Sequence, residues 1–428
     1  MRKFGIYRLG GQQQAGGRPF LMLFYVPQDS WLRMNAFLKQ HTRSVFVVLA
    51  LAFGLTLWAL FLRDQPPGEA APTSGPDDGL VWFGVDGRSQ KAISGQSNSY
   101  YDPRQPTIIF VHGWLPNQVA SPPTFMMELT DEARGIDYHL DLAAAWVEAG
   151  WNVGIFYWHP FADEDLVWVA EDKIWTADQE AAMRYRDAAG NYHTEGMPTV
   201  SAAQLFYEAY VDALREYSGP EIRLAGHSLG NQMAVRLALQ LVDGIEAGDI
   251  SPNLLPSRLT LLDPFWSPFP KSYLDGQETG TVIRQEIQQK LLPRDVIVEW
   301  YHSSLLTAET LRGEDVPQFQ AQIVFAELAP EFCSSLDQVC RHDAAWQVYF
   351  LSFGSPPPRE CAPDELSAAC LPTGEQGPMA STANERLAEM MGQPFYWVQD
   401  LGPEGEDGRS TPQTDDDWFH RLPLNQGQ

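Results

Sequence analysis

Basic residues are scarce in this sequence. Its 428 residues include 29 lysines and arginines against 55 aspartates and glutamates, which gives a formal net charge of −26. Residues 1–62 hold seven of the bases and a single acid, so the rest of the chain is strongly acidic. A body of this charge repels nucleic acid and anionic membrane surfaces, and we therefore expect no nucleic-acid partner.

Cysteine is also rare. The sequence has only four cysteines, at Cys333, Cys340, Cys361 and Cys370. Their spacing leaves no Cys-x-x-Cys pair, which argues against a structural zinc site. An even number close to the C-terminus fits two disulfides, expected as Cys333–Cys340 and Cys361–Cys370.

Residues 44–62 are a long uncharged apolar run in an otherwise charged chain. Their length is close to the roughly 20 residues that a helix needs to cross a bilayer. Arg33, Lys39 and Arg43 precede the run, and a Pro-rich, acid-containing linker at 63–79 follows it. This asymmetry predicts a signal-anchor helix, with residues 1–43 in the cytoplasm and the body on the extracytoplasmic side.

A cleaved signal peptide is the alternative interpretation of the same run, and the body would then be secreted. Small residues at Ala70 and Ala71 offer a cleavage site. If Met34 is the true start, the run has a short basic lead of conventional form. The sequence leaves anchor and cleaved signal open.

The most informative motif is Gly-His-Ser-Leu-Gly at residues 226–230, with Ser228 at its centre. A strand-like stretch at 221–225 precedes it, and a helical apolar pattern at 231–242 follows it. A serine hydroxyl is a weak nucleophile that needs a sharp turn to expose it and a base to deprotonate it. Flanking glycines relieve the crowding of such a turn, so the motif predicts a nucleophile at Ser228. A solvated serine in a glycine-rich loop is the alternative.

The rest of the chain alternates strand-like and helix-like segments. Strands are expected at 107–111, 152–157, 258–262, 296–300 and 322–326, and helices at 140–149, 201–214 and 231–242. The alternation predicts an α/β fold, with a mostly parallel central sheet and helices on both faces. We place this domain at residues 80–400, with an insertion near 158–199. Residues 401–428 are expected to form an acidic, disordered tail.

Two further parts of a catalytic site follow strands. The strand 107–111 ends at His112-Gly113-Trp114, which has the character of an oxyanion loop, although an ordinary turn fits as well. The backbone N–H groups of Trp114 and Leu229 are the expected oxyanion donors. Asp263 closes the strand 258–262, where a carboxylate is well placed to hold an imidazole. Asp295 is a competitor, but it precedes its strand and so lies at the wrong end of a parallel sheet.

A catalytic base requires a histidine after Ser228. The candidates are His302, His342 and His420, of which His420 falls in the expected tail. Both His302 and His342 preserve the chain order serine, acid, histidine. Reasoning from the residues alone leaves these two open.

Four motifs together resemble the pancreatic-type lipase branch of the α/β-hydrolase superfamily. They are His112-Gly113-Trp114, the pentapeptide 226–230, Leu261-Leu262-Asp263-Pro264 and Cys340-Arg341-His342. The resemblance spans roughly residues 105–355 and implies the α/β-hydrolase fold with Ser228, Asp263 and His342 as the catalytic residues. It also implies that His302 is non-catalytic and that no cofactor or metal is needed. The sequence departs from the family in two ways: it shows no recognisable second, lipid-binding β-sandwich domain, and segment 158–199 has no match in the resemblance. A triglyceride preference is therefore not implied.

The expectation is therefore an exported hydrolase of carboxylic esters, of lipase or esterase type, with an acyl-ester or lipid substrate. An amidase or thioesterase on the same triad is one alternative, and a non-catalytic lipid-binding homologue is another. The aromatic residues Phe156, Tyr157, Trp158 and Phe161 suggest an apolar acyl pocket. Core packing after a strand explains them equally well.

Overall fold

A computed structural model describes residues 76–131, 136–330, 332–362, 371–400 and 418–424. The expected anchor at 44–62, the segment before it and most of the linker lie outside these ranges. Within them, no helix is long and apolar enough to cross a membrane.

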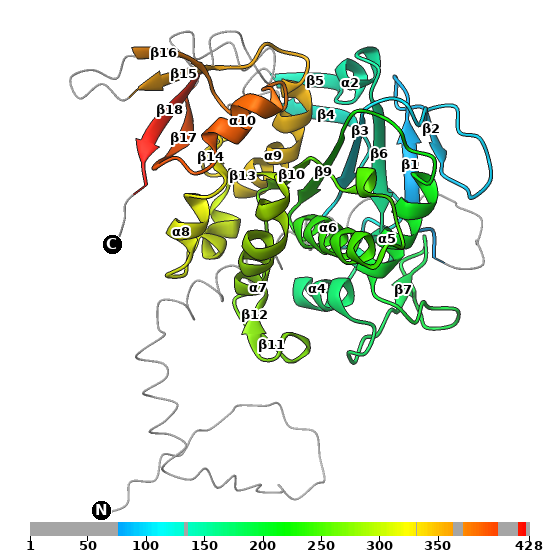
Figure 1. The fold of residues 1–428 in the computed structure, drawn as a ribbon. Coiled ribbons are helices and arrows are strands. Elements are labelled where there is room, and N and C mark those ends of the chain that lie inside the picture. Colours follow the sequence, from blue (N-terminus) through cyan, green and yellow to red (C-terminus); the bar gives the residue numbers. More distant parts are fainter. Residues whose placement is uncertain (1–75, 132–135, 331, 363–370, 401–417, 425–428) are drawn as a thin grey trace, which may run out of the picture. The chain divides into compact units, whose positions relative to one another are not determined.

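The described residues build a large sheet of 12 strands, in the order β16-β15-β18-β17-β14-β13-β10-β9-β3-β6-β1-β2 (Figure 1). The strands from β17 to β6 in this order are parallel, and antiparallel pairs lie toward both edges. The strands are β1 (Gly79–Phe83), β2 (Ser89–Lys91), β3 (Thr107–Val111), β6 (Asn152–Tyr157), β9 (Ile222–His227), β10 (Arg258–Leu262), β13 (Ile297–His302), β14 (Val324–Glu327), β15 (Arg359–Ala362), β16 (Leu371–Gln376), β17 (Phe395–Asp400) and β18 (Trp418–Pro423). The architecture is thus α/β with a mostly parallel sheet, as expected.

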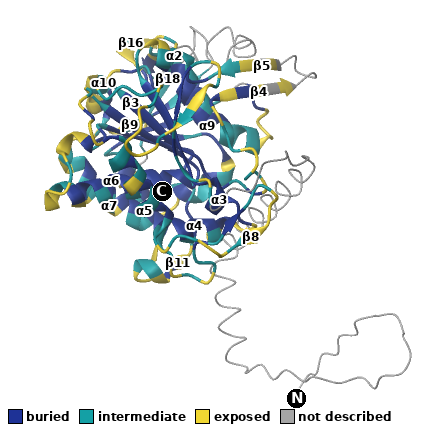
Figure 2. Cartoon of the chain, turned by 90° about the vertical axis from the view of Figure 1, so that its right-hand side faces the viewer, coloured by how far each residue is buried: buried dark blue, intermediate teal, exposed yellow. Residues whose placement is uncertain are grey.

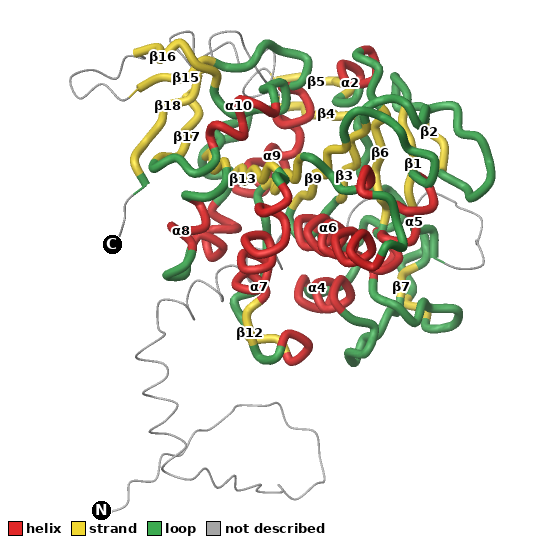
Figure 3. The backbone as a smooth tube through the Cα atoms, viewed as in Figure 1, coloured by secondary structure: helices red, strands yellow, loops and turns green. Residues whose placement is uncertain are grey.

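Helices lie on both sides of the central strands. Figure 1 shows α5 and α6 on one side and α2, α9 and α10 on the other, and Figure 3 shows the loops that connect them. The helices are α2 (Ala144–Glu148), α3 (His159–Ala162), α4 (Val167–Trp175), α5 (Ala202–Ala213), α6 (Gly230–Ala247), α7 (Thr279–Glu286), α8 (Val316–Gln320), α9 (Gln338–Ser352) and α10 (Asn384–Met390). In the described part of the chain, three two-stranded sheets lie outside the main sheet: β4 (Met126–Asp131) with β5 (Ile136–Asp141), β7 (Tyr185–Arg186) with β8 (Tyr192–His193), and β11 (Pro270–Lys271) with β12 (Gln277–Glu278).

The central strands are dominated by apolar residues, and the few polar residues in them are buried as well. All five residues of β3, Thr-Ile-Ile-Phe-Val, are buried, and so are all residues of β6, β9 and β10. Helices cover both faces of the sheet, so neither face of a central strand is exposed to solvent (Figure 2). Apolar and polar residues therefore do not alternate along these strands. The bounds of β3, β6 and β10 agree with those expected from the sequence.

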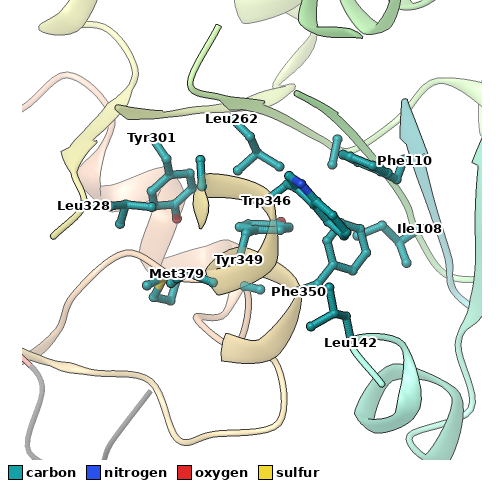
Figure 4. Close-up of a cluster of buried hydrophobic side chains, with 14 of the residues drawn as sticks. Ile108, Phe110, Leu142, Leu262, Tyr301, Leu328, Trp346, Tyr349, Phe350 and Met379 are labelled. Carbon is teal, nitrogen blue, oxygen red and sulfur yellow. The ribbon is translucent and has the colours of Figure 1, made fainter. Parts of the chain in front are cut away.

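Helix α9 is anchored by a large aromatic core. Trp346, Tyr349 and Phe350 project from it toward the sheet (Figure 4), and the ring of Trp346 stacks on that of Phe110 in β3 at 5.1 Å. Large aromatic side chains contribute much of the apolar area that a core buries. The start of α9, where His342 lies, is therefore fixed against the sheet.

Two sequence expectations need correction. The stretch 140–149, expected as a helix, is divided between the end of β5 and the short α2, because residues up to Asp141 pair with β4. The expected disordered tail contains β18, which pairs with both β17 and β15 and buries Phe419 completely. The strand contains three apolar residues, Trp418, Phe419 and Leu422. Residues 401–417 lie outside the described ranges.

One of the two expected disulfides is present. Cys333 and Cys340 are bonded, with their Cα atoms 5.5 Å apart. Cys361 takes part in a disulfide as well, and its expected partner, Cys370, lies outside the described residues. The first bond closes the loop that leads into α9.

Candidate active site

Three neighbouring strands bring the expected site residues to one edge of the sheet. β3, β9 and β10 are adjacent and parallel, so their carboxyl ends meet. The 112–114 loop follows β3, Ser228 follows β9, and Asp263 follows β10. The structure thus gathers Trp114, Leu229, Ser228 and Asp263 in one place.

Ser228 occupies a strained turn between β9 and α6. Its φ is 55°, in the left-handed region that residues with a Cβ rarely adopt. The turn is held to the acid-bearing strand, because the Ser228 N–H donates to the carbonyl oxygen of Leu262 at 3.1 Å. Strain of this kind persists only where the surrounding structure enforces it, and it is typical of functional sites.

Both glycines of the pentapeptide are required by close backbone contacts. A Cβ on Gly226 would lie 2.5 Å from the Gly230 carbonyl oxygen, and one on Gly230 would lie 2.1 Å from that of Val111. Gly113 is equally crowded, because a Cβ there would lie 2.6 Å from the Cβ of Ser228. The nucleophile turn and the 112–114 loop can therefore touch only because these positions lack side chains.

Replacing Gly230 by alanine is expected to destabilise the protein and to reduce turnover, because its new methyl group collides with backbone that cannot rotate away. Overpacking a well-packed core costs about 1–3 kcal/mol or more. Gly248→Ala is the control for backbone strain alone, since Gly248 ends α6 at a φ of 78° with open space around it: it should lower the free energy of unfolding but leave turnover unchanged. Urea unfolding and ester turnover measure both variants. Unchanged turnover in Gly230→Ala would contradict the close approach.

Asp263 is fully buried and accepts hydrogen bonds with both carboxylate oxygens. Oδ1 accepts from the N–H of Ser303 at 2.9 Å, from that of Ser304 at 3.4 Å and from the hydroxyl of Thr307 at 2.8 Å. Oδ2 accepts from the Ser304 hydroxyl at 2.5 Å and lies 2.6 Å from Nδ1 of His342. A carboxylate held by so many donors has one orientation, and its bond to Nδ1 leaves Nε2 of His342 for other chemistry.

The electrostatics of this pair favour an ionised acid beside a basic imidazole. Burial by itself raises the pKa of Asp263, but the hydrogen bond and positive charge of His342 prevail and hold the pKa well below its usual range. Burial likewise lowers the pKa of His342, and the carboxylate of Asp263 more than reverses this, so the pKa is raised. The imidazole is thereby made a stronger base.

His342 lies against the strand that carries the nucleophile. Nε2 of His227 is 3.0 Å from the His342 carbonyl oxygen, and the two rings are 4.5 Å apart. Among the described residues, no hydrogen bond joins the Ser228 hydroxyl to the His342 imidazole. Such bonds are often long in unliganded enzymes and shorten when substrate binds.

The 112–114 loop has a fixed conformation. Nδ1 of His112 lies 2.9 Å from the Gly113 carbonyl oxygen, and Nε2 accepts from the Trp158 N–H at 3.2 Å. Burial lowers the pKa of His112 to about 3, so this ring is a weak base, and its Nε2 is already bonded to the Trp158 N–H. The N–H of Leu229 opens α6, where the first N–H groups of a helix have no partner within it.

The sequence reasoning missed Asn231, which lies fully buried in the first turn of α6. Its amide nitrogen donates to the carbonyl oxygens of Ser228 and Leu262, both at 3.0 Å, and its oxygen accepts from the Leu262 N–H at 2.9 Å. Asn231 therefore ties the nucleophile turn to the residue before Asp263. A polar residue at the start of an apolar helix was the available signal.

Ser303, Ser304 and Thr307, the donors to Asp263, were also missed. Ser303 and Ser304 directly follow β13, the strand next to β10, and Thr307 lies three residues further on. A run of hydroxyl residues after a strand could have indicated partners for a neighbouring carboxylate.

The other histidines and aromatic residues considered in the sequence analysis have different surroundings. His302 ends β13, and its Nε2 is buried without a hydrogen-bond partner among the described residues. His420 lies in β18 beside Trp418. The aromatic residues after β6 pack in the core: Phe156 stacks on Phe206 at 4.2 Å, and the indole N–H of Trp158 donates to the carbonyl oxygen of His112. Core packing, and not an acyl pocket, thus accounts for these two.

No protein-family model and no curated protein sequence matches the chain. Solved structures with distant likeness include a bacterial brefeldin A esterase, a homologue of human hormone sensitive lipase, with 14% identity over 72% of this chain and 83% of that one and a TM-score of 0.30. Esterase B from Lactobacillus rhamnosis has 10% identity over 67% and 84%, with a TM-score of 0.27. Poly(aspartic acid) hydrolase-1 from Sphingomonas sp. KT-1 has 14% identity over 54% and 73%, with a TM-score of 0.25. Likeness this low assigns neither a family nor an activity.

Proposed function

We propose that the chain is a serine hydrolase of the α/β-hydrolase type that cleaves carboxylic esters, with Ser228, His342 and Asp263 as its triad. The observation that carries the proposal is the buried 2.6 Å contact between Asp263 and Nδ1 of His342, beside a serine held at a φ of 55°. The resemblance to pancreatic-type lipases belongs to this proposal. So does an extracytoplasmic location behind a membrane anchor at 44–62.

In the proposed reaction, Nε2 of His342 takes the proton of the Ser228 hydroxyl while Oγ attacks the ester carbonyl carbon. The N–H groups of Trp114 and Leu229 stabilise the resulting oxyanion. His342 then gives its proton to the leaving alcohol, which departs and leaves an acyl-enzyme. Water, deprotonated by the same imidazole, hydrolyses that intermediate and restores Ser228. Asp263 keeps the proton on Nδ1 throughout and stabilises the imidazolium.

Two exposed leucines favour an apolar acyl group. Leu336 is 90% exposed in the loop before α9, and Leu305 is 69% exposed immediately after Ser304. Their segments are joined, because the N–H of Leu305 donates to the Gln338 side chain at 2.6 Å. Leu305 follows Ser304, whose hydroxyl binds Asp263, and Leu336 lies six residues before His342, so we expect both to contact an apolar acyl chain.

Labelling with a fluorophosphonate probe, followed by a chain-length series of p-nitrophenyl esters, tests the proposal. We expect the probe to label Ser228, and kcat/KM to be higher for an ester than for a thioester or anilide of the same acyl group. Labelling with preference for the thioester or anilide would overturn the ester assignment. Absence of labelling in the folded protein would overturn the serine hydrolase.

Activity is expected to fall as pH decreases through the pKa of His342, because only the neutral imidazole accepts a proton. Since that pKa is raised, the midpoint of kcat/KM should lie above about 6.5, the ordinary value for histidine. The neighbouring carboxylate of Asp343 also favours the imidazolium. Asp343→Asn is therefore expected to move the midpoint to lower pH.

The control for this measurement is Asp243→Asn, which removes an acid on α6 that lies 3.6 Å from Lys290. It should leave the midpoint in place. Burial, with the charges of Asp263 and Asp337, raises the pKa of Asp343 itself to about 6 against the opposing effect of His342, so the shift should be seen best above that pH. A midpoint that moves upward in Asp343→Asn would contradict this account.

A further inference from the structure

The segment after β6 holds the oxyanion loop in place along its length. We define the oxyanion loop as residues 112–119 and the supporting segment as residues 158–193, which contains α3, α4, β7 and β8. The Trp158 indole N–H donates to the His112 carbonyl oxygen at 2.8 Å. The Glu164 carbonyl oxygen accepts from the Trp114 indole N–H at 2.6 Å. Both ends of the expected oxyanion motif thus contact one segment.

Asp163 makes the most specific of these contacts. It is fully buried, its Oδ1 accepts from the Asn117 N–H at 2.8 Å, and its Oδ2 accepts from the Val119 N–H at 3.1 Å. Asn117 has a φ of 59°, so the loop turns sharply where the carboxylate binds it. One carboxylate therefore satisfies two backbone donors and fixes a strained turn three residues from Trp114.

Charged groups inside the supporting segment keep Asp163 in position. Nη1 of Arg186 lies 3.5 Å from Oδ1 of Asp163 and 3.2 Å from the side-chain oxygen of Asn117. Glu164, also buried, binds Nζ of Lys173 and Nη2 of Arg184, both at 2.6 Å. Burying charges is costly, and apolar side chains would often give equal stability. A cluster of this kind instead favours one unique arrangement of the backbone around it.

We propose that Asp163 is a positioning residue that fixes the oxyanion loop so that the Trp114 N–H faces the developing oxyanion. This role rests on the proposed function. It gives the supporting segment, which the sequence resemblance left unmatched, a role in catalysis. Preorganised donors stabilise a transition state only when they are aimed at the place where charge develops. Asp163 acts through the loop and does not touch substrate.

Asp163→Asn tests the role with a side chain of nearly the same shape. The asparagine offers one oxygen to two N–H donors, and its amide group meets the second donor with a donor of its own. Losing an oxyanion donor costs about 10²–10³ in kcat, so misplacing one should cost roughly 10–100-fold. We expect kcat on p-nitrophenyl butyrate to fall by that factor with KM nearly unchanged. The affinity for butylboronic acid, which forms a tetrahedral adduct with a catalytic serine, should fall in parallel.

Asp187→Asn is the matched control. Asp187 lies in the same supporting segment and accepts from the N–H groups of Ala189 and Asn191, both at 2.9 Å, but these donors belong to the β7–β8 hairpin. Both donors bond to Oδ1, which an asparagine retains, so the substitution removes the charge and the 2.7 Å contact of Oδ2 with Nε2 of His193 without touching the oxyanion loop. It should leave kcat and boronic acid affinity unchanged.

Unchanged kcat in a folded Asp163→Asn variant would overturn the role, and so would a lower kcat with unchanged boronic acid affinity. If this variant fails to fold, Trp158→Phe decides, because it removes the bond to His112 and keeps a buried aromatic ring. If Trp158→Phe lowers kcat and boronic acid affinity in parallel, the supporting segment positions the oxyanion loop as proposed. If both values equal those of the wild type, the proposed role is overturned. Absence of Ser228-dependent turnover in the unaltered protein would instead overturn the proposed function, and this role with it.

Discussion

Replacing Ser228 by alanine is expected to reduce ester turnover by about 10⁶-fold, the scale on which loss of a triad nucleophile acts in serine hydrolases. No other described group is placed to take over, because attack needs a hydroxyl at the turn between β9 and α6, next to the oxyanion loop. The structural role of this position is in its backbone, whose N–H and carbonyl oxygen bind Leu262 and Asn231. Alanine preserves both, so the fold should survive.

Ser267→Ala provides the control, because Ser267 is also buried on a loop after β10, and its hydroxyl has no hydrogen-bond partner among the described residues. It should retain turnover and fluorophosphonate labelling, whereas Ser228→Ala should lose both. Thermal unfolding of the two variants establishes that neither effect comes from misfolding. Retained turnover in Ser228→Ala would remove the nucleophile from the proposal.

Local sequence patterns predicted the central strands well and the C-terminal part poorly. β3, β6 and β10 are short segments dominated by apolar residues and bounded by turn residues, a pattern that is recognised from local sequence. β15 and β18 are short and mixed in polarity, and each becomes a strand only through pairing with residues far away in the chain. Pairing of this kind overrides local preference, so no window of sequence could reveal it.

Some residues of the candidate site were likewise predictable from local sequence, and others were not. Ser228 and Asp263 were predicted from their positions at strand ends, which chain order and parallel pairing bring together. His342 required a family resemblance, because nothing in its local sequence distinguishes it from His302. The contact of Asp163 with the oxyanion loop joins residues more than forty positions apart, inside a segment without periodicity. Only the folded chain reveals such a contact.

His342→Ala is expected to be as damaging as Ser228→Ala, whereas His302→Ala should be much milder. Nδ1 of His342 contacts the buried Asp263 at 2.6 Å, while Nε2 of His302 is buried without a hydrogen-bond partner among the described residues. His302 has a weaker electrostatic effect on Asp263 than His342 has, so a change in kcat/KM below about tenfold is expected from its loss. Steady-state kinetics on p-nitrophenyl butyrate measures both variants.

The double variant Ser228→Ala, His342→Ala separates a catalytic pair from two independent structural effects. Groups that act as one unit are strongly non-additive, so the double variant should be no slower than either single one. If His342 merely stabilised the start of α9, its removal would lower the free energy of unfolding, and its effect on turnover would add to that of Ser228. Additive losses, or a larger loss from His302→Ala than from His342→Ala, would contradict the assignment of the base. If His302→Ala proved the more damaging, the base would be His302, at the end of β13, the strand next to the one that leads to Asp263.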